Sequence, residues 1–233
     1  MKVCRYFGSH RSCWVMIVLV VVAAMGPSPT WADPGEGTRG MVVSVHPLAT
    51  DAGLNALKAG GNAVDAAVAT ALTLGVVDGF NSGIGGGCFI LIRRQDGTLL
   101  AIDGREMAPA KAHRDMYLRD GKPQSDLSKV GPLASGVPGA LAAYELAIKS
   151  AGKTSWKDLV LPASQLAKKG FIVDEGYARK VRSVARYLAR YEGSRGILLH
   201  ADGSPLKAGE KLQQPDLAAI YQQVAEQGAK AFY

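Results

Sequence analysis

The apolar positions form short continuous runs in the first half of the chain and follow a helical period in the second half. The runs Cys88–Arg93 and Thr98–Asp103 are rich in branched and aliphatic residues, and they predict two neighbouring strands. Between them, Asp96-Gly97 is typical of a hairpin turn, because both residues tolerate a positive φ. The run Met41–Val45 predicts a further short strand.

Two helices are predicted before the hairpin. Thr50 is a suitable N-cap for a helix that ends at Gly60-Gly61, since glycine commonly terminates helices. Asn62 can cap the next helix, Ala63–Val77, with Asp65 completing an arrangement that resembles a capping box. After Asp65 this helix consists almost entirely of Ala, Val, Leu and Thr, so we expect it to be buried on most sides.

The second half of the chain is predicted to be mostly helical. The predicted helices are Gly139–Ser150, Ser155–Lys169 (interrupted or kinked at Pro162), a helix from an Asp174 cap to about Tyr191, and one from Pro215-Asp216 to about Gly228. The helix capped by Asp174 has an apolar stripe along one face. Four arginines lie largely outside that stripe: Arg179, Arg182, Arg186 and Arg190. Such a basic amphipathic helix is typical of a solvated face, with a membrane surface or a partner as the alternatives. Strands and helices together predict an α+β fold.

The first 32 residues have the organisation of a signal peptide. Lys2, Arg5 and Arg11 precede the apolar run Trp14–Met25, and Thr30-Trp31-Ala32 provides small residues for cleavage after Ala32. We therefore expect an exported protein, periplasmic or secreted, with residues 33–233 as one domain. The apolar run is too short to cross a bilayer comfortably, so no stable membrane span is expected, and a retained N-terminal anchor is the alternative.

Charge and cysteine content exclude some classes of function. The whole chain has a formal charge of +7, which falls to about +4 without the signal, a value that gives no case for nucleic-acid binding. Removal of the signal leaves Cys88 as the one cysteine, which we interpret as a small buried residue rather than a nucleophile.

The histidines do not indicate a metal site. His46, His113 and His200 lack partners at ligand spacing, so we expect no metal site and no cofactor.

The strongest candidate for chemistry is the glycine-rich run Ser82–Gly87 beside Arg105. A two-residue turn in the hairpin would set Cys88 opposite Arg105, and a four-residue loop would set Gly86 opposite it. In both registers backbone without side chains lies next to a guanidinium, which fits a small molecule bearing a carboxylate. The alternative is a plain tight turn and a solvated arginine. No Gly-Lys-Ser/Thr ending follows, so this is not a phosphate loop.

Several motifs occur in an order that resembles one family. They are Gly40–Pro47, Ala59–Ala67, Ser82–Gly87, Asp103–Pro109, Ser135–Gly139 and Gly228–Tyr233. Together they are similar to the N-terminal part of the large subunit of γ-glutamyltransferases (glutathione hydrolases), within the superfamily that includes the cephalosporin acylases.

The resemblance implies an N-terminal-nucleophile hydrolase fold, an αββα sandwich that is incomplete in this chain. In the family a precursor cuts itself, and the new N-terminal Thr of the small subunit attacks a γ-glutamyl amide with its own amine as base. That Thr lies beyond Tyr233, so we expect no catalytic residue here and no activity of the chain alone. Arg105 matches the arginine that binds the α-carboxylate of the γ-glutamyl group. The implied partners are glutathione or other γ-glutamyl compounds and the missing small subunit.

Two alternatives remain open at this point. A related cephalosporin or glutaryl acylase would use the same fold on another acyl group, and Arg105 does not separate glutamyl from glutaryl donors. A non-catalytic carboxylate-binding remnant would use Arg105 and the glycine run without cleavage.

Overall fold

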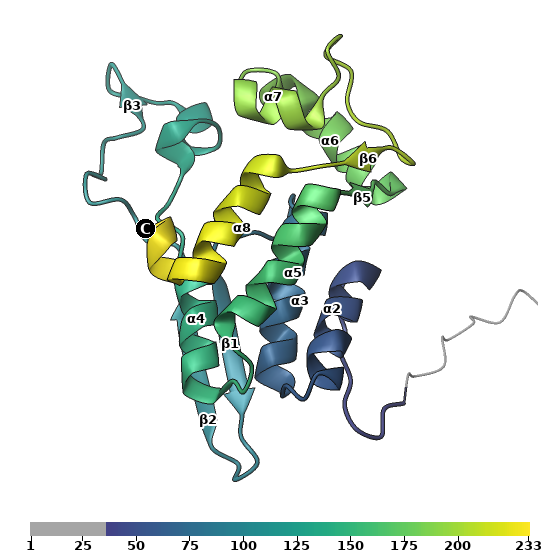
Figure 1. The fold of residues 1–233 in the computed structure, drawn as a ribbon. Helices are drawn as coiled ribbons and strands as arrows, with labels where there is room; N and C mark the ends of the chain where they lie inside the picture. Colours follow the sequence, from purple (N-terminus) through teal and green to yellow (C-terminus); the bar gives the residue numbers. More distant parts are fainter. Residues whose placement is uncertain (1–35) are drawn as a thin grey trace, which may run out of the picture. The chain divides into compact units, whose positions relative to one another are not determined.

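The computed structural model describes residues 36–233, so the predicted signal peptide, residues 1–32, lies outside the described part. Arg39–Tyr233 contains both helices and strands, as predicted for an α+β fold (Figure 1). The α-helices are α2 (Pro47–Lys58), α3 (Ala63–Val77), α4 (Ala140–Ala151), α5 (Trp156–Lys169), α6 (Glu175–Leu188), α7 (Glu192–Leu198) and α8 (Pro215–Gln227). The strands are β1 (Cys88–Arg93), β2 (Leu99–Gly104), β3 (Leu118–Arg119), β4 (Lys122–Pro123), β5 (Phe171–Ile172) and β6 (Lys211–Leu212); 3-10 turns η1 (Ser125–Ser128), η2 (Pro132–Ala134) and η3 (Ala229–Phe232) complete the order.

Helix α3 has the predicted bounds and the predicted cap. The Asn62 side chain accepts hydrogen bonds from the amides of Val64 (2.8 Å) and Asp65 (3.2 Å), and the Asp65 carboxylate accepts one from the Asn62 amide (2.7 Å). This reciprocal pairing satisfies amides that the first helical turn leaves unpaired. Most residues of α3 are buried, as its composition predicted.

Two expectations near the start of this region are wrong. Helix α2 begins at Pro47 rather than after Thr50, and its N-cap is His46, whose Nδ1 accepts a hydrogen bond from the Leu48 amide (3.2 Å). Proline suits the first helical position because its φ is preset and its missing N–H is not needed there. Met41–Val45 has the alternating exposure of a strand, but no strand of the described residues pairs with it, so it forms no sheet.

The pairing register of the hairpin lies between the two predicted registers, so each prediction is wrong by one residue. Strand β1 pairs antiparallel with β2 from Cys88–Gly104 to Arg93–Leu99. The Arg94 amide then donates to the Thr98 carbonyl (2.9 Å), and Gly97 takes a φ of +87°. This is a three-residue loop with glycine in the left-handed position. Gly87 and Arg105 follow directly after the last pair.

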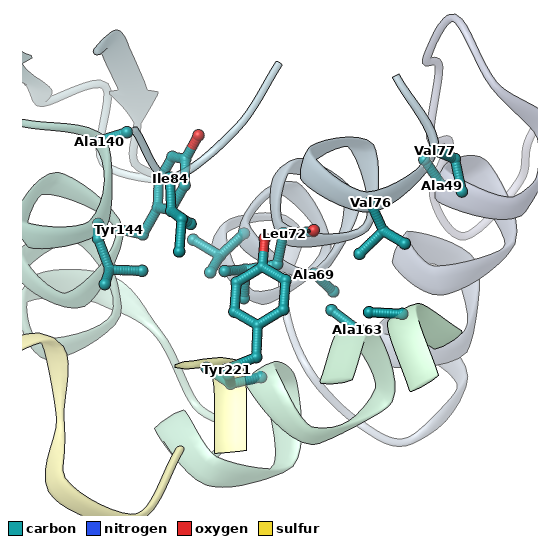
Figure 2. Close-up of a cluster of buried hydrophobic side chains, with 14 of the residues drawn as sticks. Ala49, Ala69, Leu72, Val76, Val77, Ile84, Ala140, Tyr144, Ala163 and Tyr221 are labelled. Atoms are coloured by element: carbon teal, nitrogen blue, oxygen red, sulfur yellow. Dashed lines mark hydrogen bonds between the residues drawn. The ribbon is translucent and has the colours of Figure 1, made fainter. Parts of the chain in front are cut away.

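Helix α4 lies along the hairpin, while α3, α5 and α8 pack together beside it (Figure 1). Figure 2 shows the shared core, in which Tyr221 of α8 points towards Leu72 of α3. The Tyr221 hydroxyl donates to the Leu72 carbonyl (2.9 Å), so this buried polar atom has a partner. Tyr144 of α4 and Ile84, which belongs to the glycine-rich run, extend the core into that run.

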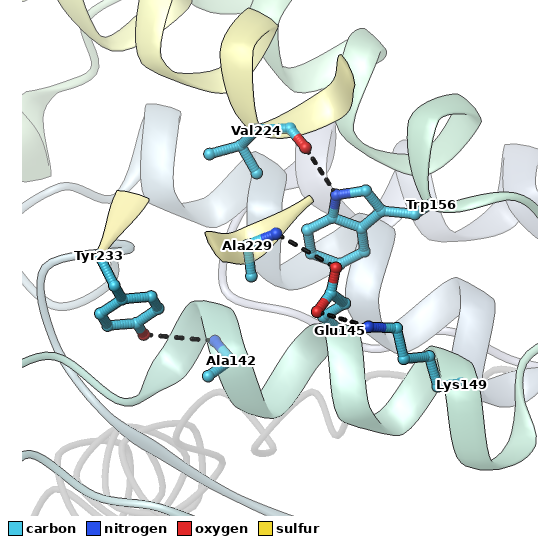
Figure 3. A network of polar contacts seen from close by, with 7 residues as sticks. All are labelled: Ala142, Glu145, Lys149, Trp156, Val224, Ala229 and Tyr233. Atoms are coloured by element: carbon cyan, nitrogen blue, oxygen red, sulfur yellow. Dashed lines mark hydrogen bonds and ion pairs between the residues drawn. The ribbon is translucent and has the colours of Figure 1, made fainter. Parts of the chain in front are cut away.

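A polar network joins the end of the chain to α4 (Figure 3). The Glu145 carboxylate accepts hydrogen bonds from Lys149 Nζ (2.8 Å) and from the Ala229 amide (3.2 Å). Hydrogen bonding from Lys149, followed by that from Ala229, holds the pKa of Glu145 below its usual value. The Trp156 indole donates to the Val224 carbonyl (2.8 Å), which links α5 to α8.

The remaining helices depart from prediction in two places. Helix α5 runs through Pro162 without interruption, and the helix capped by Asp174 ends at Leu188, with α7 as a separate helix after it. The four arginines predicted to lie off the apolar stripe are all exposed. None of the helices in residues 36–233 is long and apolar enough to cross a membrane.

Candidate functional site

Three glycine-containing segments that are far apart in the sequence meet at one point. The Gly86 carbonyl accepts hydrogen bonds from the amides of Gly139 and Ala140, each at 3.1 Å. Close by, Met107 and Val137 exchange two backbone hydrogen bonds, at 3.0 and 2.8 Å. The glycine-rich run, the end of β2 and the start of α4 are therefore held together by main-chain contacts.

These segments form one side of an open cleft of about 930 Å³. Helices α3, α6, α7 and α8 provide its other walls. The residues lining it are Ala71, Leu74, Gly75, Gly79–Cys88, Arg105, Glu106, Tyr144, Tyr177, Gly193, Ser194, Ile197, Leu198, Gln214 and Leu217. Its size suits a small molecule.

Arg105 lies in the wall of this cleft directly after β2. Its amide donates to the Asp103 carboxylate (3.0 Å), which fixes the backbone at the end of the strand. Its Nη1 is 3.5 Å from Glu106 Oε2, and 63% of its side chain is exposed. An exposed pair at this distance is weak, so the planar fork of the guanidinium remains available to a ligand carboxylate.

The glycine-rich run opposite Arg105 offers main chain rather than side chains. A Cβ on Gly87 would lie only 2.7 Å from the Gly104 carbonyl oxygen and 2.8 Å from the Glu106 amide nitrogen, so this close approach of backbone requires glycine. Within residues 36–233 no backbone carbonyl outside the helices and strands accepts a hydrogen bond from the amides of Gly83, Gly85 and Gly87. Such amides can donate to a bound anion or a polarised carbonyl. The sequence thus correctly placed Arg105 beside the run.

The start of the run is anchored by a buried acid. The Asp78 carboxylate accepts hydrogen bonds from Ser82 Oγ (3.1 Å) and Asn81 Nδ2 (3.3 Å). This contact keeps the turn after α3 in one conformation, because both side chains are tied to the helix end.

The far wall of the cleft is aromatic and was not predicted. The Phe80 and Tyr177 rings meet edge to face with centroids 5.3 Å apart. Burial, with a smaller contribution from Asp78, raises the pKa of Tyr177 to about 12, and burial with Cys88 does the same for Tyr144. Both hydroxyls are therefore neutral at physiological pH. The sequence placed Tyr177 on an apolar helix stripe but carried no sign that the stripe faces this cleft.

Cys88 lines the cleft but is poorly suited to nucleophilic attack. Burial, and then the negative charge of Glu106, raises the pKa of its thiol, so the reactive thiolate is disfavoured. No group of three His, Cys, Asp or Glu side chains in the described part of the chain is placed to hold a metal ion. His46 instead caps α2, and His200 Nε2 lies 3.1 Å from Glu210 Oε2.

Comparison with known proteins gives a consistent result. The sequence model of the family described as Gamma-glutamyltranspeptidase matches residues 49–233. The glutathione hydrolase proenzyme of Escherichia coli (strain K12) is 44% identical over 202 residues, which cover 86% of this chain and 35% of that protein. The chain thus spans about a third of the length of this relative.

Solved structures agree on the fold. The crystal structure of Helicobacter pylori gamma-glutamyltranspeptidase superposes with a TM-score of 0.83 at 35% identity, covering 86% of this chain and 58% of that one. The cephalosporin acylase from Bacillus halodurans superposes with a TM-score of 0.70 at 26% identity, covering 87% and 40%. The α+β fold is therefore similar to that of both enzyme types.

Proposed function

Because the chain belongs to the γ-glutamyltranspeptidase family, we propose that it is the N-terminal part of the large subunit of an exported glutathione hydrolase or γ-glutamyltransferase. Its substrate would be glutathione or another γ-glutamyl amide, and its location periplasmic or extracellular. The observation that carries the proposal is the position of Arg105, which lines a cleft of small-molecule size together with the glycine-rich run.

Arg105 would bind the α-carboxylate of the γ-glutamyl group. A guanidinium pairs with a carboxylate through two parallel hydrogen bonds, which orient the donor as well as attract it. The contact with Glu106 is weak, so a ligand carboxylate can displace it. Holding the donor in one orientation would place its γ-amide for attack.

The reacting groups would come from outside these 233 residues. A Thr at the N-terminus of the small subunit would attack the γ-carbonyl, and its own α-amine would take the hydroxyl proton. The C–N bond breaks, the leaving amine takes a proton, and the γ-glutamyl group is held as an ester. Water or an acceptor amine then releases it. This chain would bind and orient the donor and contribute no catalytic residue, so it would be inactive alone.

The partner would be the remainder of the same precursor, completing an αββα sandwich. One stripe of α3, Ala63, Ala67, Ala71 and Leu74, is left incompletely covered between the extended segment Met41–Val45 and β1. Apolar side chains beside it are strongly exposed, among them Val43 at 83% and Phe89 at 71%. Extended backbone and apolar surface of this kind are suited to added strands, which would pair with both edges.

An acylase acting on another acyl group is the second candidate. The similarity to the Bacillus halodurans cephalosporin acylase supports it, although the identity is lower than for the γ-glutamyltranspeptidases. The two candidates differ in the donor they cleave: a glutamyl group carries an α-amine that a glutaryl group lacks.

A chimera tests the proposal. The matched region of the Escherichia coli proenzyme would be replaced by residues Gly40–Tyr233 of this chain. We expect self-cleavage into two subunits and hydrolysis of γ-glutamyl-p-nitroanilide in preference to the glutaryl analogue. Preference for the glutaryl compound would favour the acylase. A folded, processed chimera that cleaves neither compound would contradict the proposal, as would hydrolysis by the 233-residue chain alone.

A further inference from the structure

Lys180 of α6 lies beside the aromatic end of the cleft, against a ring that lines it. Its Nζ is 5.8 Å from the centre of the Phe80 ring, which lines the cleft and is 42% exposed. Tyr177, one turn earlier on α6, supports the same ring from the side. The ammonium group therefore sits over a ring that is itself part of the cleft wall.

The charge of Lys180 is not used elsewhere in the described structure. No carboxylate of residues 36–233 lies within ion-pair distance of its Nζ, and the side chain is exposed. The buried acid at this end of the cleft, Asp78, is already bonded to Asn81 and Ser82. An ammonium held over an aromatic face and left without a counter-ion can attract an anion.

One cation, Arg105, therefore lies in the cleft wall after β2, and a second, Lys180, lies just outside the lining, over the Phe80 ring at the rim. We propose that Lys180 determines specificity for donors whose leaving amine carries its own carboxylate, that is, γ-glutamyl amino acids and peptides. This inference rests on the function proposed above. With the α-carboxylate on Arg105, the scissile amide lies between the two anionic groups of such a donor, and the second carboxylate would be directed to Lys180.

Neutral leaving groups would gain nothing from Lys180. The contact is with a single charge at an exposed position, so its effect would be modest and sensitive to salt. Phe80 and Tyr177 would still provide apolar contact for any leaving group. Lys180 would therefore alter the ratio between charged and neutral donors without affecting the rate of the chemical step.

Two donors that differ only in this charge test the inference: γ-glutamylglycine and γ-glutamylglycinamide. In the processed enzyme that carries this chain, we expect Lys180→Met to lower kcat/KM for γ-glutamylglycine roughly three- to fivefold. The effect would lie in KM, and the glycinamide donor would be unaffected. Lys180→Arg should restore most of the preference, and Arg179→Met, which removes the neighbouring exposed cation, should leave it intact.

The outcomes distinguish a failure of the Lys180 inference from a failure of the proposed function. An unchanged ratio in Lys180→Met would overturn the role of Lys180, as would an equal loss with both donors, which would indicate a structural role. Turnover of neither donor by the unsubstituted enzyme would overturn the proposed function and this inference with it. A ratio that falls in Lys180→Met and is restored in Lys180→Arg would support the inference.

Discussion

The Gly139 amide lies 3.1 Å from the Gly86 carbonyl oxygen, so the first turn of α4 is tied to the loop that lines the cleft. No side chain fits at this junction. A Cβ on Gly139 would overlap the Gly104 carbonyl oxygen and lie 2.7 Å from that of Arg105. The position of Arg105 thus depends on a glycine 34 residues further along the chain.

We expect Gly139→Ala to destabilise the fold by about 1–3 kcal/mol, because backbone must move to admit the methyl group. Urea denaturation would measure it. Gly196→Ala is the matched control, since no atom lies within 4 Å of the added Cβ and helix α7 would gain from alanine. Equal stability of the two variants would show that the junction tolerates a side chain.

Asp65 should be a major determinant of stability. Its buried carboxylate accepts hydrogen bonds from the amides of Asn62 (2.7 Å), Lys153 (3.0 Å) and Thr154 (3.0 Å), which join the start of α3 to the α4–α5 loop. Asp65→Ala leaves these amides without an acceptor and should cost about 3 kcal/mol or more. The exposed Asp216→Ala, at the start of α8, should cost a few tenths, roughly 0.5 kcal/mol or less. Thermal or urea unfolding that ranks them equally would contradict this.

Stability should fall at alkaline pH through the buried tyrosines. Tyr144 and Tyr177 have pKa values of about 12 in the folded state against an ordinary value of 10.0. The unfolded chain therefore loses these protons first, and the stabilisation, complete below pH 10, is lost as pH rises through 12. The loss should be roughly 1 kcal/mol per tyrosine at about pH 11.

The pH dependence can be assigned with single variants. Tyr177→Phe and Tyr144→Phe should each flatten the decline in unfolding free energy between about pH 9 and about pH 11, because phenylalanine has no proton to lose. Curves parallel to that of the unsubstituted chain would exclude these two residues as its cause.

Replacement of Arg105 should weaken donor binding in the processed enzyme. Arg105→Lys keeps a charge but loses the bidentate fork, and Arg105→Met loses both. We expect KM for γ-glutamyl-p-nitroanilide to rise roughly 10- to 100-fold in Arg105→Met, with a smaller rise in Arg105→Lys. Arg182→Met, which removes another exposed arginine, is the control. Unchanged KM in both Arg105 variants would remove the basis for the proposed carboxylate site.

The sequence predicted the bounds of those elements whose ends are fixed by residues close by in the chain. Helix α3 has the predicted bounds because Asn62 and Asp65 satisfy its first amides without help from distant residues. Strand β1 likewise matches its apolar run. The hairpin register was missed, because it depends on the left-handed φ of Gly97, which glycine permits but does not require.

Elements that need a distant partner were less predictable. Met41–Val45 alternates as a strand does, but pairing depends on a second edge, and none of the described residues provides it. Thr50 was predicted as an N-cap because threonine is favoured at that position. Its hydroxyl instead lies 2.8 Å from Ser44 Oγ, since Pro47 starts the helix earlier.

For the site, the sequence by itself determined one pairing: the glycine-rich run and Arg105 lie at the ends of adjacent strands, so the hairpin had to bring them together. Only the tertiary structure decided what surrounds them. The packing of α4 and α6 sets Gly139 against the Gly86 carbonyl and brings Tyr177 and Lys180 to the Phe80 ring. That packing buries apolar surface contributed by segments far apart in the chain, and periodicity within one segment cannot show which of its neighbours it will face.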